Sequence, residues 1–243
     1  MGSEFPFLSK VQIETTAVDL LMSYDDHLLK DPAAIPIEDI IENHLGISLE
    51  YQLLSDKDED ILGVTIFTSG KLPIYDFEAG CIVEKYIPAK SIIIDERLAQ
   101  DSSREARFRF TCAHEAAHWH LHSHVYILRE MQTSLFGQAD KYVACAARDV
   151  DAKPRNYSNS WTERDRLEWQ ADYMASVLLM PTKTFKASYL EISQRLSKIY
   201  TDDTRHRLVI DEISKLFQVS KQAAHYRSKS LNLIHHNKNQ ELF

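Results

Sequence analysis

Hydrophobic and polar residues recur with two different periods along the first half of the chain, and these periods predict two helices followed by strands. The apolar residues of 9–29 recur at helical spacing, which predicts an amphipathic first helix. A second, short helix is predicted between Pro36, which suits a first turn, and Gly46, which suits a C-terminal cap. Over 47–53 every second residue is apolar, the period of a half-buried strand.

Three further apolar segments predict the rest of a small, mainly antiparallel sheet. Segments 61–68 and 72–77 are interpreted as a hairpin joined by the turn Ser69-Gly70-Lys71. Three consecutive isoleucines predict a more fully buried strand over 91–95. The first half of the chain is therefore expected to contain the sheet.

Helical periodicity returns after a polar turn at 101–103, and predicts a helix from about Arg104 to His122. The segment 125–159 has weak periodicity and a polar end, so it is interpreted as a partly ordered excursion. A further helix is predicted from about residue 160 or 162 to Leu179, where Pro181 ends it. These patterns predict the α+β class.

The helix predicted to end at His122 carries the pattern HEAAH at 114–118, an HExxH motif. Residues four apart lie on one face of a helix, so His114 and His118 can present their imidazoles to one zinc ion. Glu115 lies beside the metal, where it can take a proton from a zinc-bound water and hand it to a leaving amine. The motif therefore predicts peptide-bond hydrolysis with Glu115 as the base.

A catalytic zinc site usually takes three protein ligands, so a third ligand is expected downstream. His124 has that place in the metzincin pattern HExxHxxGxxH, but Leu121 stands where the pattern needs a glycine to break the helix. Glu168 is favoured, because it shares a helix face with Asp172, which can accept a hydrogen bond from a metal-bound histidine, as in thermolysin-like enzymes. His122, on the same face as the motif histidines, is a weaker alternative.

Two blocks of the sequence together resemble the ImmA/IrrE family of zinc metallopeptidases. The family pattern is an RxxFTxAHExGHxxLH-like block followed by ExxAxxFAxxLLMP. The matching stretches are RFRFTCAHEAAH at 107–118, followed by Leu121 and His122, and EWQADYMASVLLMP at 168–181. The order of helix, short helix and strands before the motif is also similar, so the resemblance covers most of the chain.

The resemblance implies a zincin-like metallopeptidase in which His114, His118 and Glu168 bind Zn²⁺. Glu115 would be the general base, and Asp172 would contact a metal-bound histidine. Family members typically cleave helix-turn-helix repressors and release genes of mobile elements or stress responses. A repressor-type regulator is therefore the expected protein substrate.

The sequence departs from the family pattern at two points. Ala117 stands where the family usually has glycine before the second histidine, a small-for-small change that should spare the helix. Fifty residues separate His118 from Glu168, more than is usual in the family. The segment 125–159 is therefore interpreted as an insertion that either forms a substrate-binding flap or obstructs the cleft.

Peptide hydrolysis also needs a group that stabilises the negative charge developing on the carbonyl oxygen. Tyr142, Tyr157 and several histidines lie in or near the segment 125–159 and are candidates for that group. Nothing in their spacing chooses among them. The sequence thus predicts the ligands and the base and leaves this residue open.

The composition is that of a soluble globular protein, with 44% hydrophobic and 26% charged residues. Its net charge of −8 argues against a whole surface that binds nucleic acid or anionic lipid. The sequence contains no run of about 18 apolar residues and no N-terminal secretory signal. Three cysteines without paired spacing fit reduced thiols, so we expect a cytoplasmic protein that does not enter a membrane.

Basic charge is concentrated at the C-terminus, where 204–243 contains seven Lys or Arg against three Asp or Glu. Residues 213–231, with a turn at 218–220, predict a helix-turn-helix-like pair. The second helix carries four side chains that could enter a major groove, those of Lys221, Gln222, His225 and Arg227. The favoured interpretation is that the pair caps the peptidase domain or docks its substrate. DNA binding would be weak, and the protein a monomer or weak dimer.

The expected organisation is a zincin-like domain at 6–200 and a helical C-terminal region at 201–243. The first functional hypothesis is a zinc-dependent endopeptidase that cleaves a repressor-type regulator and thereby acts as an anti-repressor. The alternative is a DNA- or protein-binding regulator with a proteolytically silent zinc site. Glu115 discriminates between them, because a purely structural site has no need of a base between its ligands.

Overall fold

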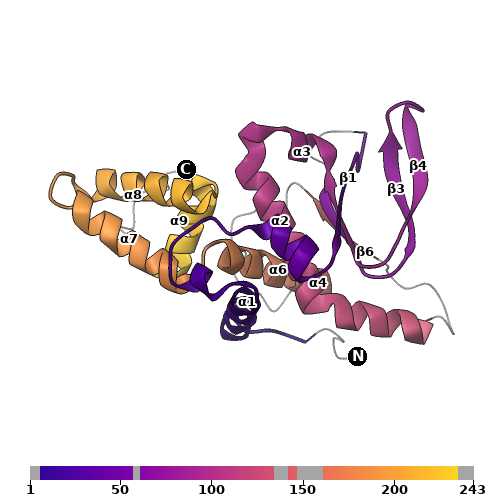
Figure 1. Cartoon of the computed structure of the whole chain (residues 1–243), viewed down its shortest axis with the longest axis horizontal. Helices are drawn as coiled ribbons and strands as arrows, with labels where there is room; N and C mark the ends of the chain where they lie inside the picture. Colours follow the sequence, from indigo (N-terminus) through magenta and orange to yellow (C-terminus); the bar gives the residue numbers. More distant parts are fainter. Residues whose placement is uncertain (1–5, 57–60, 134–141, 147–160, 235–243) are drawn as a thin grey trace. The chain divides into compact units, whose positions relative to one another are not determined.

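The computed structural model describes residues 6–56, 61–133, 142–146 and 161–234 (Figure 1). It is a mixed α+β protein, as predicted. Its residues group into two compact units, Met1–Ile13 with Pro36–Ala175 and Glu14–Ile35 with Ser176–Phe243. The predicted division at residue 200 stays a prediction. Within the described ranges, no helix combines the length and apolar character needed to cross a membrane.

A four-stranded sheet with the order β1-β5-β2-β6 lies at the centre of the first unit. Its strands are β1 (Ser48–Gln52), β5 (Ser91–Asp95), β2 (Ile61–Ile66) and β6 (Tyr142–Ala146). β1 pairs in parallel with β5, whereas β2 is antiparallel to both β5 and β6. The strands predicted over 47–53 and 91–95 are confirmed, and the sheet is mainly antiparallel.

The predicted hairpin between 61–68 and 72–77 is wrong. Strand β3 (Gly70–Asp76) pairs with β4 (Cys81–Ile87) in a separate two-stranded sheet. The turn that joins these two strands ends at Gly80, whose φ of 63° is one that glycine adopts readily. The sequence pattern does not predict β4, because most of its side chains are exposed and its hydrophobic periodicity is weak.

Helix α4 (Glu105–Thr133) packs against β2 and β5. Because side chains alternate across a strand, Gly63 and Thr65 of β2 face this helix. Val64 and Ile66 face the opposite side, where β3 and β4 cover the sheet (Figure 1). The core on that side consists of Leu54, Val64, Ile66, Leu72, Ile74, Ile87 and Ile93. One strand thus contributes both to the core and to the surface that meets α4.

Helix α4 continues beyond its predicted end at His122 to Thr133. Val125 and Tyr126 on this extension are buried, and the ring of Tyr126 stacks on Phe67 with centroids 4.1 Å apart. This packing favours a longer helix than the local sequence pattern indicates. The segment 125–159, predicted as a partly ordered excursion, contains the last turns of α4 and the strand β6 at 142–146. The remainder, 134–141 and 147–159, lies outside the described residues, as does any flap there.

Helix α1 and five shorter helical segments precede and follow the strands in the first half of the described chain. They are α1 (Lys10–Tyr24), η1 (Asp26–Leu29), α2 (Ile37–Asp39), η2 (Ile40–His44), α3 (Glu96–Gln100) and η3 (Ser102–Arg104). The predicted first helix is divided at Asp25, whose side chain accepts a hydrogen bond from the backbone of His27 and starts a new turn. Gly46, with a φ of 60°, follows the second predicted helix as expected of a C-terminal cap.

The C-terminal helices are α6 (Glu163–Leu179), α7 (Thr182–Leu196), α8 (Asp202–Phe217) and α9 (Lys221–Ser230). The first of these spans the boundary between the two units. Gln218 ends α8 in the left-handed conformation, and the side chain of Ser220 caps α9 by accepting a hydrogen bond from Ala223. The predicted pair of helices with a turn at 218–220 is confirmed.

Arg227 of α9 lies inside the second unit, with 1% of its surface exposed. Its guanidinium donates to the carbonyl oxygen of Met180 at 3.1 Å and to Oγ1 of Thr182 at 2.7 Å. It also lies 3.6 Å from the carboxylate of Glu14. Arg227 therefore stabilises the packing of this unit, and its prediction as a side chain presented to DNA is wrong.

We expect Arg227→Met to lower the free energy of unfolding by about 1–3 kcal/mol, because the buried carbonyl of Met180 loses its donor. Urea denaturation followed by circular dichroism measures this change. Lys229→Met, at an exposed position of the same helix, should change stability by no more than about 0.5 kcal/mol. Equal unfolding midpoints for the two variants would contradict the assigned role of Arg227.

Candidate metal centre

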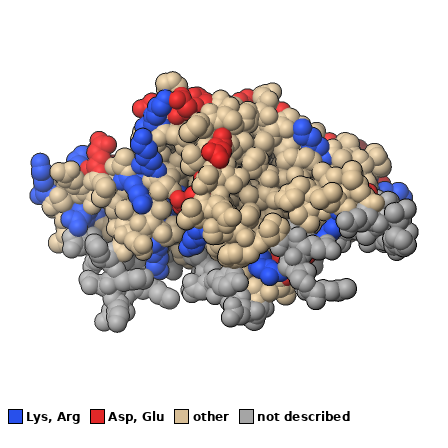
Figure 2. Space-filling view, turned by 90° about the horizontal axis from the view of Figure 1, so that it is seen from below, with Lys and Arg blue, Asp and Glu red and all other residues tan. Residues whose placement is uncertain are grey.

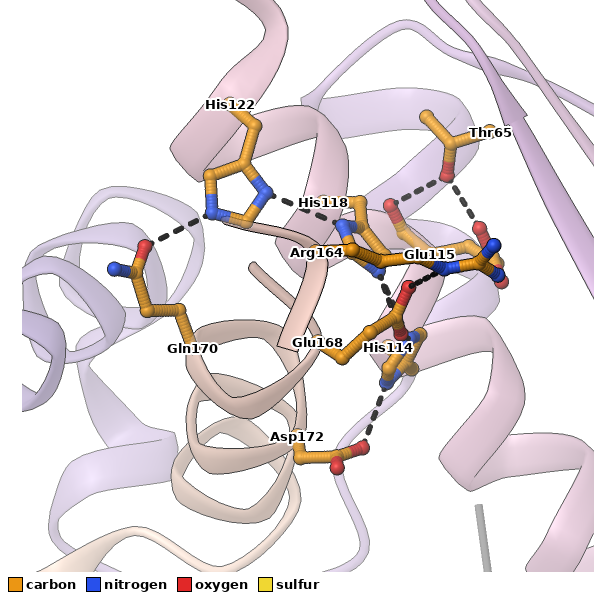
Figure 3. Close-up of polar contacts among 9 residues, drawn as sticks. All are labelled: Thr65, His114, Glu115, His118, His122, Arg164, Glu168, Gln170 and Asp172. Atoms are coloured by element: carbon orange, nitrogen blue, oxygen red, sulfur yellow. Dashed lines mark hydrogen bonds and ion pairs between the residues drawn. The ribbon is translucent and has the colours of Figure 1, made fainter. Parts of the chain in front are cut away.

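His114, His118 and Glu168 bring three ligand atoms together within the first unit (Figure 3). The Nε2 atoms of the two histidines are 2.9 Å apart. Oε2 of Glu168 lies 3.2 Å from Nε2 of His114 and 3.5 Å from Nε2 of His118. The three ligand atoms lie within 4.8 Å of one another, and all three residues are buried. The structure thus places together the residues that the sequence predicts as ligands.

Local sequence signals determine where α6 begins, and so where Glu168 lies. Thr162 and Asp165 cap the helix reciprocally: each backbone N–H donates to the other residue's side chain, at 3.0 and 3.1 Å. Arg129 near the end of α4 forms an ion pair of 2.8 Å with Glu163 at the start of α6. Glu168 follows in the second turn of α6, facing the histidines of α4.

The hydrogen bonds around the cluster leave lone pairs on its ligand atoms that can bind a cation. Oδ1 of Asp172 lies 2.9 Å from Nδ1 of His114, and a carboxylate only accepts, so Nδ1 of His114 donates and its Nε2 keeps a lone pair. Both carboxylate oxygens of Glu168 are buried and have no hydrogen-bond partner among the described residues. Lone pairs and negative charge that converge in a buried place are costly unless a cation lies between them. Two imidazoles and one carboxylate are a donor set that fits zinc.

The charge state of Glu168 is consistent with a metal ligand. Burial by itself raises the pKa of this carboxyl group, but the neighbouring imidazoles of His118 and His114 outweigh it and hold the pKa below its usual range. Glu168 is therefore ionised near neutral pH. Metal binding requires that form of a carboxylate.

The two alternative third ligands take other places. His124 is exposed and does not belong to the cluster of ligand atoms found among the described residues. His122 is buried behind His118, and its Nε2 lies 3.0 Å from Oε1 of Gln170. Burial, together with the neighbouring His118, lowers the pKa of His122 to about 3, so it is neutral. His122 thus contacts a predicted ligand and does not take the place of Glu168.

Glu115 lies fully buried beside the cluster, and only one of its carboxylate oxygens is hydrogen-bonded within the described chain. Oγ1 of Thr65 donates to Oε2 at 2.6 Å and also lies 3.0 Å from the backbone oxygen of Glu115. Oε1 has no hydrogen-bond partner among the described residues. Burial raises the pKa of Glu115 against the opposing effect of the nearby histidines and Thr65. A carboxylate with a raised pKa and one free oxygen is suited to take up a proton.

Sequence reasoning did not identify Thr65 or Gly63 as parts of this site. Both residues stand out in the otherwise apolar strand β2: Thr65 carries a hydroxyl group, and Gly63 lacks a side chain. A Cβ on Gly63 would lie 2.8 Å from Oε1 of Glu115 and 2.9 Å from Cγ2 of Thr111. Because Gly63 has no side chain, β2 can approach α4 closely at Glu115.

For the peptide cleavage that the HEAAH motif predicts, Gly63→Ala is expected to lower the rate about 100-fold, because the added methyl group displaces Glu115 while the candidate ligands stay in place. Cleavage kinetics and zinc content are measured on the same preparation. Gly80→Ala is the control: its Cβ meets nothing within 4 Å, so it should affect stability through its positive φ and leave the cleavage rate unchanged. Wild-type cleavage by Gly63→Ala would show that this close approach is unimportant.

The oxyanion-stabilising group stays unassigned. The side chain of Tyr142 and the whole of Tyr157 lie outside the described part of the structure. Arg164 is the basic residue drawn beside the cluster in Figure 3, where its Nε lies 3.8 Å from Oε1 of Glu168. Its side chain is 64% exposed. The described residues thus do not choose among the candidates named from the sequence.

Comparison with known families matches residues 143–229 to the model of a peptidase family, described as IrrE N-terminal-like domain. The match covers Glu168 and Asp172 and extends through α7 and α8 into α9, whereas the HEAAH motif precedes it. A search of curated proteins finds no match. Over 143–229 the chain is thus similar to this peptidase family, which agrees with the two sequence blocks and with the convergence of their residues.

Proposed function

We propose that the protein is a zinc-dependent endopeptidase in which His114, His118 and Glu168 bind the metal and Glu115 is the general base. The observation that carries the proposal is the buried convergence of two imidazole nitrogens with a carboxylate that has no hydrogen-bond partner among the described residues. A second carboxylate with one free oxygen lies beside them. The two histidines and the base come from the same helix, α4, so their relative positions are fixed by helix geometry, whereas Glu168 comes from α6.

When bound, a zinc ion supplies a Lewis acid that polarises a carbonyl oxygen and makes a nearby water more acidic. Oε1 of Glu115 then takes a proton from the attacking water, while Thr65 holds the other oxygen in place. The same oxygen passes the proton to the departing amine. Asp172 fixes the ring of His114 through Nδ1, so that the lone pair of Nε2 would be available to hold the metal.

The number of candidate ligands supports a catalytic zinc site over a structural zinc site without activity. Structural zinc sites usually have four protein ligands, whereas catalytic sites have three and keep a position for water. Among the described residues the cluster contains three ligands. A buried base beside them has a use in hydrolysis and none in a structural site.

The proposed substrate is a helix-turn-helix repressor, whose cleavage would release expression of a mobile element or a stress response. The similarity of 143–229 to the IrrE N-terminal-like family and the resemblance of the two sequence blocks support this substrate class. The protein is incubated with zinc and each regulator encoded beside its gene, and fragment masses locate any cut. One specific cut, blocked by chelation and restored by zinc, is expected. No cut in any of these regulators would contradict the substrate, and a cut unaffected by chelation would contradict the metal mechanism.

DNA binding by the C-terminal helices is a weaker proposal. The α8–turn–α9 geometry supports it, but Arg227 is buried and Lys221 forms an ion pair with Asp211 at 2.5 Å. On the face drawn in Figure 2, Lys and Arg are scattered, with Asp and Glu among them. With Arg227 buried and Lys221 paired, α9 offers few phosphate contacts, and its affinity for DNA should be low. A salt-dependent shift of operator DNA without cleavage of any partner would favour this alternative.

A further inference from the structure

A chain of hydrogen bonds, buried except at its far end, lies behind His118, on the side away from the ligand cluster (Figure 3). Nδ1 of His118 lies 3.2 Å from Nδ1 of His122, and Nε2 of His122 lies 3.0 Å from Oε1 of Gln170. The amide nitrogen of Gln170 donates to the carbonyl oxygen of Pro6 at 3.2 Å. The chain therefore links α4 to α6, and α6 to the N-terminal segment. His118, His122 and Gln170 are all buried.

The chemistry of its far end fixes the direction of every hydrogen bond in this chain. A carbonyl oxygen only accepts, so Gln170 presents its NH₂ to Pro6 and its Oε1 to His122. Nε2 of His122 must then donate, which leaves a lone pair on Nδ1 of the neutral ring. Nδ1 of His118 must donate to that lone pair. The lone pair of His118 is thereby placed on Nε2, the atom that belongs to the cluster.

The end of the chain is itself held in place by packing. Phe7 stacks on Trp169 with ring centroids 6.3 Å apart, and Nζ of Lys10 lies 5.3 Å above the ring of Tyr173. These contacts hold the residues after Pro6 against α6. The carbonyl oxygen of Pro6 is thus held where it can accept from Gln170, and this contact sets which ring nitrogens of the two histidines carry protons.

We propose that His122 and Gln170 are positioning residues that hold His118 as the Nδ1-protonated tautomer, with Nε2 free for the metal. The inference rests on the proposed metal site and deepens it. His114 is held by the carboxylate of Asp172, whereas His118 is held by a neutral imidazole. A neutral acceptor orients the second ligand without adding another negative charge beside Glu115 and Glu168.

The test compares His122→Leu with His122→Asn, whose side-chain oxygen can accept near the position of Nδ1. Zinc affinity of the metal-free proteins is measured by competition with a chromophoric chelator. His122→Leu is expected to bind zinc about 10–100-fold more weakly, and His122→Asn to recover most of that loss. His124→Leu, at an exposed position of the same helix, is the control and should bind as wild type does. Equal affinity of His122→Leu and wild type, or equal weakening in the Leu and Asn variants, would overturn the proposal.

Two further measurements keep the test independent of folding and of catalysis. The visible spectrum of the cobalt-substituted protein should change in His122→Leu, because the ligand ring is no longer held. In unmutated zinc-loaded protein, ¹⁵N NMR should show His118 protonated at Nδ1, and protonation at Nε2 would overturn the proposal without any mutation. If wild-type protein binds no zinc, the proposed function itself fails. If it binds zinc but shows the other tautomer, the positioning role alone fails.

Discussion

Glu115→Gln should abolish peptide cleavage while zinc stays near one ion per chain. The amide keeps the size of the side chain and can still accept from Thr65, but it cannot take a proton from water. General-base catalysis typically contributes about 10²–10⁴-fold, so a loss of that size or larger is expected. Cleavage rate and metal content are measured on one preparation.

The control for this variant is Glu105→Gln, at an exposed position at the start of the same helix. It removes one negative charge from α4 without touching the cluster, and its cleavage rate should match wild type. Normal cleavage by Glu115→Gln would show that another group is the base. Loss of zinc from Glu115→Gln would show that the residue also supports the metal.

Glu168→Ala should lose the metal. The substitution removes the one carboxylate of the cluster and leaves two imidazoles as ligands from the described chain. Zinc affinity should fall on the order of 100-fold or more, beyond the effect of removing a residue that only orients a ligand. Chelator competition measures the affinity, and cleavage should fall with metal occupancy.

Glu191→Ala provides the matched control, because Glu191 is exposed on α7. It should bind zinc as tightly as wild type and cleave at the same rate. Full zinc retention by Glu168→Ala would make the third-ligand assignment wrong. His122 would then be the first alternative to examine, since it is the buried histidine next to His118.

The grouping of the candidate metal ligands could be predicted from the sequence because the spacing within each pair is local. His114 and His118, and likewise Glu168 and Asp172, are four residues apart, and helix geometry places each pair on one face. The sequence also indicates both helices through their periodicity. The structure adds that the two faces meet, with Oδ1 of Asp172 2.9 Å from Nδ1 of His114.

The residues that support Glu115 were not predictable, because they come from strand pairing. Thr65 and Gly63 reach the helix only because β2 lies between β5 and β6. Its partners are set by contacts distant in sequence, and the local pattern instead favoured a hairpin with 72–77. The chain from His118 to Pro6 was missed for the same reason, since Gln170 and Pro6 are 164 residues apart.

The turn at 218–220 and the helix after it were predictable, whereas the extent of α8 and the role of Arg227 were not. The sequence indicates α9 and only the end of α8, which begins at Asp202 and not at Ile213. An arginine in a basic segment is usually exposed, which made Arg227 a candidate for the less favoured DNA contact. Its burial depends on the carbonyl of Met180 and on Thr182, which precede it by more than forty residues.

Anomalous diffraction at the zinc edge, from crystals of the zinc-loaded protein, would locate the bound metal. We expect one strong peak about 2.0–2.2 Å from Nε2 of His114, Nε2 of His118 and a carboxylate oxygen of Glu168. Oε1 of Glu115 should lie nearby without binding to it. A peak elsewhere, or one ligated by Glu115 in place of Glu168, would contradict the account.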